Sequence, residues 1–379
     1  MVLYLIKFKR EGMGMKKESA ATIRAKQYTK NADWFCEFKY EPVEGLGYEE
    51  GIHRRDPSSV IKVGDLYYVW YTKSVGEAVG FNTGDPDSKV FPWDQSDVWY
   101  ATSPDGTTWT ERGMAVGRGP KGSYDDRSVF TPEILHHDGK FYLVYQVIEG
   151  QYLLRKYENI AMAVAESPEG PWRKLDAPIL RPAMNGEWFG DDDNRLTVKH
   201  KGDFDSLKVH DPVLFYYNNQ FWLYYKGEQK GEEMNFGGRT TKWGVAISDH
   251  PEGPYVKSEY NPVTNSGHET LLWHYRGGMA ALLSTDGPEK NTIQYAPDGI
   301  NFEIEAVIKN PPEAAGPFRT EDTDRSPLEG IRWGLCHNVH TKWNHILKFR
   351  TVEDYKHYYA NKINPEVLWL GKKAKQKKD

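Results

Sequence analysis

The sequence predicts an all-β protein, a five-bladed β-propeller preceded by a short helical N-terminal arm. Two kinds of β-hairpin recur along its 379 residues and alternate with one another. Two hairpins per repeat make a four-stranded blade, and a four-stranded repeat of roughly 50 residues is typical of a propeller. The first kind of hairpin occurs five times, the last copy being weak, so we expect five blades.

The first hairpin joins two strands rich in aromatic or aliphatic residues through a turn of Gly, Asp or Asn. Its copy over 208–226 shows the pattern most clearly, because Asp211 precedes an apolar run that Asn218-Asn219 separates from a second run. Paired Asn residues favour a tight hairpin turn. The other copies span 56–71, 131–145 and 269–283, the last with Gly277-Gly278 as its expected turn, and a weaker match begins at residue 331.

The second hairpin has small residues in its first strand and an aromatic residue in its second. Its turn is of the Ser-Pro-Asp-Gly type, in which Pro presets φ and Gly accepts a positive φ. The four copies span 100–109, 163–172, 245–255 and 294–302.

Acidic residues stand at what we take to be the same position near the start of four inner strands: Asp56, Glu133, Asp211 and Glu269. The inner strands of a propeller line its central channel, so these carboxylates should converge on one axis. Unpaired buried carboxylates are costly, and like charges in one concave site shift each other's pKa. We therefore interpret the four acids as a functional site.

His268 stands directly before Glu269. A lone His most often hydrogen-bonds a backbone carbonyl, but in an acidic cleft it can be held protonated and donate a proton. Neighbouring residues of a strand point to opposite faces. Both side chains therefore reach the channel only if a bulge or loop forms at Gly267.

Three loops have compositions that can form binding sites. The long connection 81–97 carries Trp93, which we expect either to stack on a ligand or to anchor the loop. The Gly-rich stretch 117–127 lacks the spacing of a phosphate-binding loop. The acidic stretch 185–195 lacks EF-hand spacing and is interpreted as a surface turn, with cation binding as the minority interpretation.

Composition excludes several classes of protein. The formal net charge of −5 gives no electrostatic footprint for nucleic acid. No apolar run approaches the ~20 residues of a membrane span, and the one at Met1 is shorter than the ~7–15 residues of a signal-peptide core. Cys36 and Cys336 are expected to be reduced thiols, with a single bridge between them as the alternative. The aromatic content of 14% suits strands and stacking on sugar rings.

We divide the chain into an N-terminal extension over 1–45, a propeller over 46–350 and a C-terminal tail over 351–379. Residues 18–28 contain no Gly or Pro and are rich in helix formers, which predicts the helical arm. The arm packs either on its own propeller or on a second subunit, since exchange of terminal segments is a low-cost route to dimers.

Five stretches, in order along the chain, resemble glycoside hydrolase family 117, the 1,3-α-3,6-anhydro-L-galactosidases or neoagarooligosaccharide hydrolases. The likeness covers nearly the whole chain after about residue 17. The five stretches are His53–Ser58, Arg127–Glu133, Lys208–Pro212, Ser266–Thr270 and Gly330–His337.

This resemblance implies a homodimer that exchanges its N-terminal arms. It implies release of 3,6-anhydro-L-galactose from the non-reducing end of agar-derived oligosaccharides. No cofactor is required, although a divalent cation (Mg, Zn or Ca) occurs near the site in the family, with ligands that cannot be transferred to this chain. The implied location is the periplasm, and the cytoplasm is the alternative because no clear signal peptide is present.

The resemblance assigns Asp56 as general base and His268 as general acid, with Asp211 and Glu269 completing the catalytic set. We expect five further residues to bind the substrate: Trp93, Arg127, Thr131, Glu133 and Gln146.

Such a set suits inverting hydrolysis, in which one group protonates the leaving oxygen and another, about 6.5–9.5 Å away, activates water. Acids on different blades suit this gap better than the ~5 Å of a retaining pair. In an alternative assignment Glu269 is the acid and His268 its partner. Two rival functions are a non-catalytic sugar-binding propeller and another propeller glycosidase, such as an arabinanase.

Overall fold

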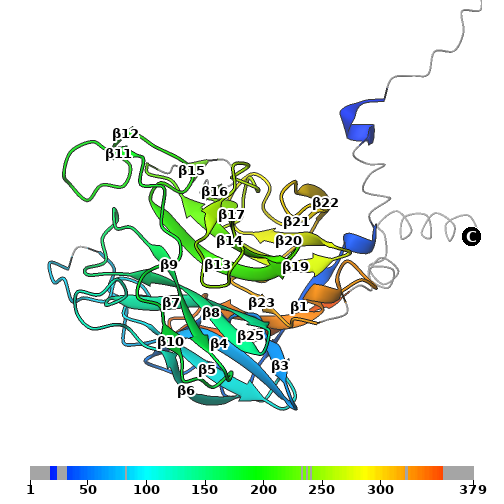
Figure 1. The fold of residues 1–379 in the computed structure, drawn as a ribbon, viewed down its shortest axis with the longest axis horizontal. Helices are drawn as coiled ribbons and strands as arrows, with labels where there is room; N and C mark the ends of the chain where they lie inside the picture. Colours follow the sequence, from blue (N-terminus) through cyan, green and yellow to red (C-terminus); the bar gives the residue numbers. More distant parts are fainter. Residues whose placement is uncertain are drawn as a thin grey trace, which may run out of the picture.

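The computed structural model describes residues 18–23, 32–81, 83–231, 234–235, 238–239, 241–320 and 323–352. Their five larger antiparallel sheets, of four or five strands each (Figure 1), confirm the predicted five-bladed β-propeller. Helix is scarce in this part of the molecule: η1 (Ala32–Trp34), η2 (Glu329–Ile331) and one helical turn over 20–23. The rest of the arm predicted over 18–28 lies outside the described residues.

The first four blades follow one another along the chain, each sheet running from the channel to the rim. Blade one holds β2 (Ile52–Arg55), β4 (Leu66–Val75), β5 (Asp97–Ser103) and β6 (Thr110–Val116), with β3 (Ile61–Val63) paired to β4. Blade two holds β7 (Ser128–His137), β8 (Lys140–Ile148), β9 (Asn159–Ala165) and β10 (Arg173–Lys174). Blade three holds β13 (Lys208–Tyr217), β14 (Gln220–Glu228), β17 (Lys242–Ser248) and β18 (Val256–Lys257). Blade four holds β19 (Glu269–Tyr275), β20 (Gly278–Ser284), β21 (Thr292–Ala296) and β22 (Glu303–Val307).

Blade five joins the two ends of the described residues. Its strands are β23 (Gly316–Pro317), β24 (Trp333–Asn338), β25 (His345–Val352) and, at the rim, β1 (Glu37–Pro42). β1 pairs with β25 from Glu37 opposite Val352 to Pro42 opposite Leu347. The domain boundary predicted at residue 45 therefore divides this blade, because the N-terminal strand closes the ring.

Two short hairpins stand apart from the blades. They pair β11 (Glu187–Trp188) with β12 (Val198–His200) and β15 (Met234–Asn235) with β16 (Gly238–Arg239).

The hairpin turns follow the predicted pattern with one shift. Asn218 and Asn219 have φ of 51° and 58°, the left-handed conformation that a two-residue hairpin turn of this kind requires. In blade four the turn is Arg276-Gly277 and not the expected Gly277-Gly278. Gly278 instead begins β20, where an added Cβ would lie 2.6 Å from the carbonyl oxygen of Ala296.

A bulge shapes the inner strands of blades two and three. The register slips between Phe130 and Glu133 and between His210 and Val213, so two residues face one on the neighbouring strand. Thr131 and Asp211 sit in these bulges, and each has a φ near 50°. Asp56, which follows β2 in blade one, has a similar φ of 47°. In blade two, Thr131 thus holds the position that Asp56 and Asp211 hold in their blades. The prediction that Glu133 holds this position was wrong by two residues.

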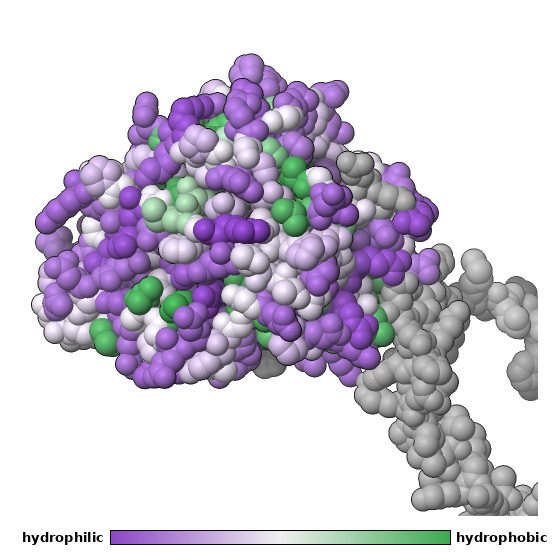
Figure 2. Space-filling model, turned by 90° about the horizontal axis from the view of Figure 1, so that it is seen from below, coloured by the Kyte–Doolittle hydropathy of each residue, from purple (hydrophilic) through white to green (hydrophobic). Residues whose placement is uncertain are grey.

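The blades pack through large buried side chains, among which Trp70, Tyr71, Tyr145 and Trp243 are almost fully enclosed. The face shown in Figure 2 is mainly hydrophilic, with hydrophobic residues in small scattered groups. Among the described residues no helix is long and apolar enough to cross a membrane.

The N-terminal segment is anchored to the propeller core before β1 begins. Trp34 is 8% exposed and packs edge-on against Tyr275, with ring centroids 5.1 Å apart, and against Tyr295 at 5.4 Å. Cys36 and Cys336 belong to the same core cluster, and both are buried and form no disulfide bond. The segment therefore ties blade five to blade four.

We predict that Trp34→Ala lowers the free energy of unfolding by about 3–5 kcal/mol, because it removes a buried aromatic side chain from this cluster. Tyr260→Ala is the matched control, since Tyr260 is 62% exposed and its loss should cost no more than about 0.5 kcal/mol. Urea denaturation of both variants measures the difference. Equal stabilities would show that the N-terminal segment does not contribute to the core.

Candidate active site

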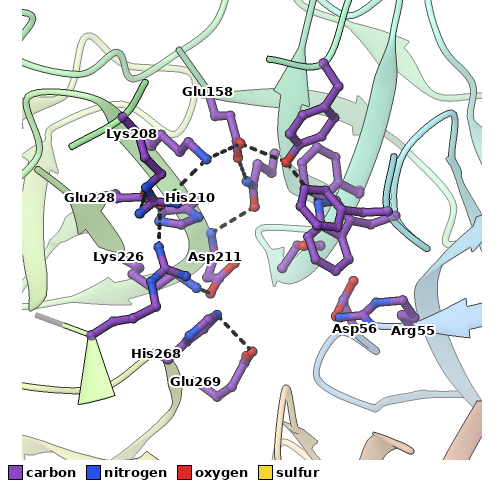
Figure 3. A pocket seen from close by; sticks show the side chains of 18 residues that line it. Arg55, Asp56, Glu158, Lys208, His210, Asp211, Lys226, Glu228, His268 and Glu269 are labelled. Atoms are coloured by element: carbon purple, nitrogen blue, oxygen red, sulfur yellow. Dashed lines mark hydrogen bonds and ion pairs between the residues drawn. The ribbon is translucent and has the colours of Figure 1, made fainter. Parts of the chain in front are cut away.

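A cavity of about 230 Å³ opens at one end of the central channel. Blades one to four supply its walls, through the ends of β2, β7, β13 and β19 and through loops between strands. Figure 3 shows Asp56 and Arg55 on one side and Asp211, His268 and Glu269 on the other. The four residues predicted to be catalytic therefore meet in one cavity, although they come from three blades.

Asp56 follows the last residue of β2 and is 7% exposed. Its Oδ1 lies 3.0 Å from Nδ1 of His337 and 3.4 Å from Nη2 of Arg55. Burial alone would raise the pKa of Asp56, but Arg55 and His337 outweigh it and hold that pKa below its usual range. Asp56 is therefore ionised at neutral pH and able to accept a proton.

Asp211 occupies the bulge of β13, and its carboxylate forms an ion pair with Lys226 of β14. Its backbone N–H donates to Oε1 of Gln146 at 3.5 Å, which links blade three to blade two. Burial raises the pKa of Asp211 while Lys226 opposes the rise. Gln146 and Thr131, two of the residues predicted to bind the substrate, also line the cavity.

His268 and Glu269 both reach the cavity because the backbone turns at Gly267, whose φ is 110°. His268 Nδ1 lies 2.6 Å from Oδ2 of Asp286, and its Nε2 lies 3.7 Å from Oε1 of Glu269. Sequence reasoning missed Asp286. It stands in the segment after β20 where Thr285 and Asp286 both have positive φ, a strained arrangement typical of functional sites.

The two candidate proton donors have pKa values shifted in opposite directions. Burial, helped by Lys226, lowers the pKa of His268 to about 4 although Asp286 opposes the shift. Burial, together with the charges of Asp211 and Asp56, raises the pKa of Glu269 to about 8. At neutral pH His268 is neutral and Glu269 is protonated. Proton donation by His268 would require a raised pKa, whereas the pKa of His268 is lowered.

An aromatic wall stands beside Asp56. Trp93 stacks on Phe91 with ring centroids 4.4 Å apart, and the Arg55 guanidinium lies 4.7 Å from the centre of its ring. The Trp93 Nε1–H donates to the hydroxyl of Tyr152 at 3.0 Å. Trp93, predicted either to stack on a ligand or to anchor its loop, thus lines the cavity together with Phe91 and Tyr152, which the sequence did not indicate.

Two buried carboxylates outside the predicted set organise the cations of the cavity. Glu228 pairs with Arg195 at 2.8 Å, with Arg239 at 2.9 Å and with Lys208 at 3.6 Å. Glu158 forms a second ion pair with Lys208, at 2.8 Å. Burial alone would raise the pKa of Glu228, but these three cations lower it to about 2. Both β13 and β14 carry a Lys and an acidic residue close together, Lys208 with Asp211 and Lys226 with Glu228. This was the sequence pattern that could have indicated the network.

Arg195 reaches the cavity from the acidic stretch that the sequence indicated to be a surface turn. Arg155 holds this loop by donating to the carbonyls of Gly190, at 2.8 Å, and Asn194, at 2.9 Å. Asp193 accepts the backbone N–H of Arg155 in return, at 2.9 Å. The stretch is thus a surface turn that is clamped so as to deliver one side chain to the cavity.

Two residues predicted to bind the substrate lie behind the cavity. Arg127 makes two bonds to Asp94, at 2.6 and 2.7 Å, and so braces the loop that carries Trp93. Glu133 pairs with Arg319 at 2.8 Å and accepts the backbone N–H of Ser59 at 2.9 Å. Both side chains are committed to structural partners.

Within the described ranges, no three His, Cys, Asp or Glu side chains lie close enough together to hold a metal ion. These residues therefore supply no protein ligand set for the divalent cation that the resemblance implies.

The fold and its opposed acids, with the match of residues 52–196 to the model of glycosyl hydrolases family 43, define a glycoside hydrolase of the propeller type. A solved structure, Zg3597, a family 117 glycoside hydrolase produced by the marine bacterium Zobellia galactanivorans, is 36% identical, with a TM-score of 0.70 over 85% of this chain and 92% of that one. The present protein belongs to glycoside hydrolase family 117.

More distant structures share the fold alone. BmSUC1, a GH32 β-fructofuranosidase of Bombyx mori, is 10% identical, with a TM-score of 0.51 over 87% of this chain and 66% of that one. CoXyl43, a GH43 β-xylosidase/α-arabinofuranosidase from a compost microbial metagenome, is 16% identical, with a TM-score of 0.52 over 83% and 94%. No curated protein matched the sequence.

We predict that Glu228→Gln destabilises the protein by about 3–5 kcal/mol at pH 7, because it removes a buried charge that three cations share. The lowered pKa of Glu228 means that this stabilisation is complete above its unfolded pKa of ~4.3 and is lost as the pH falls toward about 2. The deficit of the variant should therefore shrink below pH ~4.5. Urea titrations at several pH values measure it, with Glu187→Gln, in an exposed ion pair with Lys199, as the control that should change little.

Proposed function

We propose that the protein is an exo-acting 1,3-α-3,6-anhydro-L-galactosidase that releases 3,6-anhydro-L-galactose from the non-reducing end of neoagarooligosaccharides with inversion. The observation that carries the proposal is that Asp56 and Glu269 face each other across one cavity, where Arg55 and His337 lower the pKa of Asp56 and burial raises the pKa of Glu269. Membership of family 117 supports the substrate class.

Asp56 acts as the general base in this proposal. Its carboxylate takes a proton from a water molecule that attacks the anomeric carbon. The positive charge of Arg55 keeps it ionised between catalytic cycles. A base of lowered pKa is a weaker proton acceptor, but it remains in the correct protonation state throughout the neutral range.

Glu269 replaces His268 as the proposed proton donor. Its carboxyl group is neutral at pH 7 and can protonate the glycosidic oxygen as the bond to the leaving sugar breaks. Neutral His268 donates its Nδ1–H to Asp286, which turns the Nε2 lone pair toward Glu269. His268 and Asp286 thereby orient the donor, and they favour return of a proton to it after each cycle.

Lys226 and Asp211 complete the electrostatic balance around the bond. The Lys226 ammonium and the Asp211 carboxylate both face the cavity and are paired with each other. Together they offer a donor and an acceptor for hydroxyl groups of the sugar at the non-reducing end. Phe91 and Trp93 line the cavity and offer apolar contacts to the sugar.

The resemblance also supports three proposals about the state of the enzyme. These are a homodimer joined by the N-terminal arm, a periplasmic location with the cytoplasm as the alternative, and a divalent cation near the site that is held largely through water.

We predict that the protein converts neoagarobiose into 3,6-anhydro-L-galactose and galactose, followed by NMR of the products. Asp56→Asn is the control and should lower kcat by ~10²–10⁴, since it removes general base catalysis, while the thermal transition is kept. Binding of neoagarobiose without turnover would favour a non-catalytic sugar-binding propeller. Cleavage of arabinan but not of neoagarobiose would favour a different propeller glycosidase.

We predict that kcat/KM falls as the pH rises through about 8, because Glu269 must keep its proton to act as the acid. An aryl glycoside whose leaving group needs no protonation should restore turnover in Glu269→Gln far more than in His268→Gln. Steady-state kinetics of both variants on both substrates measure this difference. Rescue of His268→Gln and not of Glu269→Gln would return the role of acid to His268.

A further inference from the structure

We propose that His337 is a positioning residue for the catalytic base, holding the Asp56 carboxylate in its reactive orientation from outside the cavity. The inference rests on the role of Asp56 proposed above. His337 lies on β24 in blade five, and no cavity-lining residue within the described ranges comes from that blade. Blade five would thus contribute to the reaction without touching the substrate.

The contact between the two side chains is short and enclosed. His337 Nδ1 lies 3.0 Å from Oδ1 of Asp56, and their side chains are 2% and 7% exposed. The two residues are far apart in sequence and belong to the first and last blades. Water has little access to this pair, so the hydrogen bond is stronger than the same bond at the surface.

Charges around the pair indicate that His337 acts as a neutral donor. Burial and the charge of Arg55 lower the pKa of His337, while Asp56 and Glu313 oppose the shift. A neutral imidazole carries one N–H, and a carboxylate can only accept, so the proton of His337 lies on Nδ1. The ring can orient Asp56 without taking up the proton that the base removes from water.

The same seam between blades one and five holds the backbone that leads to Asp56. The Asn344 carbonyl accepts the N–H of Arg54 at 2.9 Å, and its Oδ1 accepts Nη1 of Arg55 at 2.9 Å. The Asn344 N–H donates to Nδ1 of His53 at 3.2 Å. Blade five therefore fixes both the main chain and the carboxylate of the base.

Three other titratable groups interact electrostatically with Asp56. Arg55 lies beside it, and Asp211 and Glu269 sense its charge across the cavity. Loss of the His337 hydrogen bond removes one of the two main effects that lower the Asp56 pKa. The acidic limb of kcat/KM should then move to higher pH while the alkaline limb stays in place.

The test compares His337→Ala with His337→Asn, whose side-chain N–H lies close to the place of Nδ1–H. His337→Ala should lower kcat by roughly ten- to hundredfold, the effect of losing a hydrogen bond to a charged group, with little change in KM. His337→Asn should recover most of kcat and the position of the acidic limb. An unchanged kcat in His337→Ala, or an equal loss in both variants that follows their thermal stability, overturns the proposal.

A second measurement does not depend on the substrate. In protein labelled with ¹⁵N at histidine, His337 should show the neutral Nδ1–H form, and Asp56→Ala should shift it toward Nε2–H. An Nε2–H form in the wild-type protein overturns the inference. If neoagarobiose is not cleaved but the Nδ1–H form and its dependence on Asp56 are found, the proposed substrate fails and the positioning contact stands.

Discussion

Taking three carboxylates out of water in a single cavity requires compensation for each of them, and the surrounding structure provides it in three different ways. Asp56 is compensated by Arg55 and a neutral histidine, and Asp211 by a lysine. Glu269 has no cation of its own within 4 Å in the described structure, and it is compensated by retaining a proton. Three similar side chains therefore acquire different chemistry from their positions on different blades.

The second layer of the site has the opposite problem, an excess of positive charge. Lys208, Arg195 and Arg239 converge on Glu228, and Lys208 is shared with Glu158. Glu228 is 2% exposed, so removing it takes a buried counter-charge from three cations at once. The network makes the cavity wall rigid and ties a surface loop, through Arg195, to the inner strands of blade three.

Much of the fold could be predicted because its determinants are local. The hairpin around Asn218-Asn219 and the two alternating kinds of hairpin depend on short patterns of strand and turn residues. The inner strand of blade five, Gly316–Pro317, is too short to carry a pattern. β1 joins that blade only because the ring must close, which is a non-local condition.

The site shows the same division. Asp56, Asp211, His268 and Glu269 could be located because they stand in repeated or recognisable stretches. The position of Glu133 was misjudged because the bulge adds a residue, and aligning the blades on Pro132 and Pro212 would have indicated Thr131. The contacts of His268 with Asp286 and of Asp56 with His337 depend on strand register and blade packing. Protonation states depend on burial, which the sequence alone does not reveal.

The ion pair between Glu133 and Arg319 bears on how a sugar chain can enter and leave the cavity. Beneath the three acids the channel narrows to a space of about 40 Å³ that Glu133 lines, and Arg319 lines a separate hollow beyond it. The ion pair therefore joins a residue that lines one space to a residue that lines the other. For the exo action proposed above, a channel closed by this pair would admit an oligosaccharide only by its tip, and the terminal sugar would leave last, through the opening by which it entered.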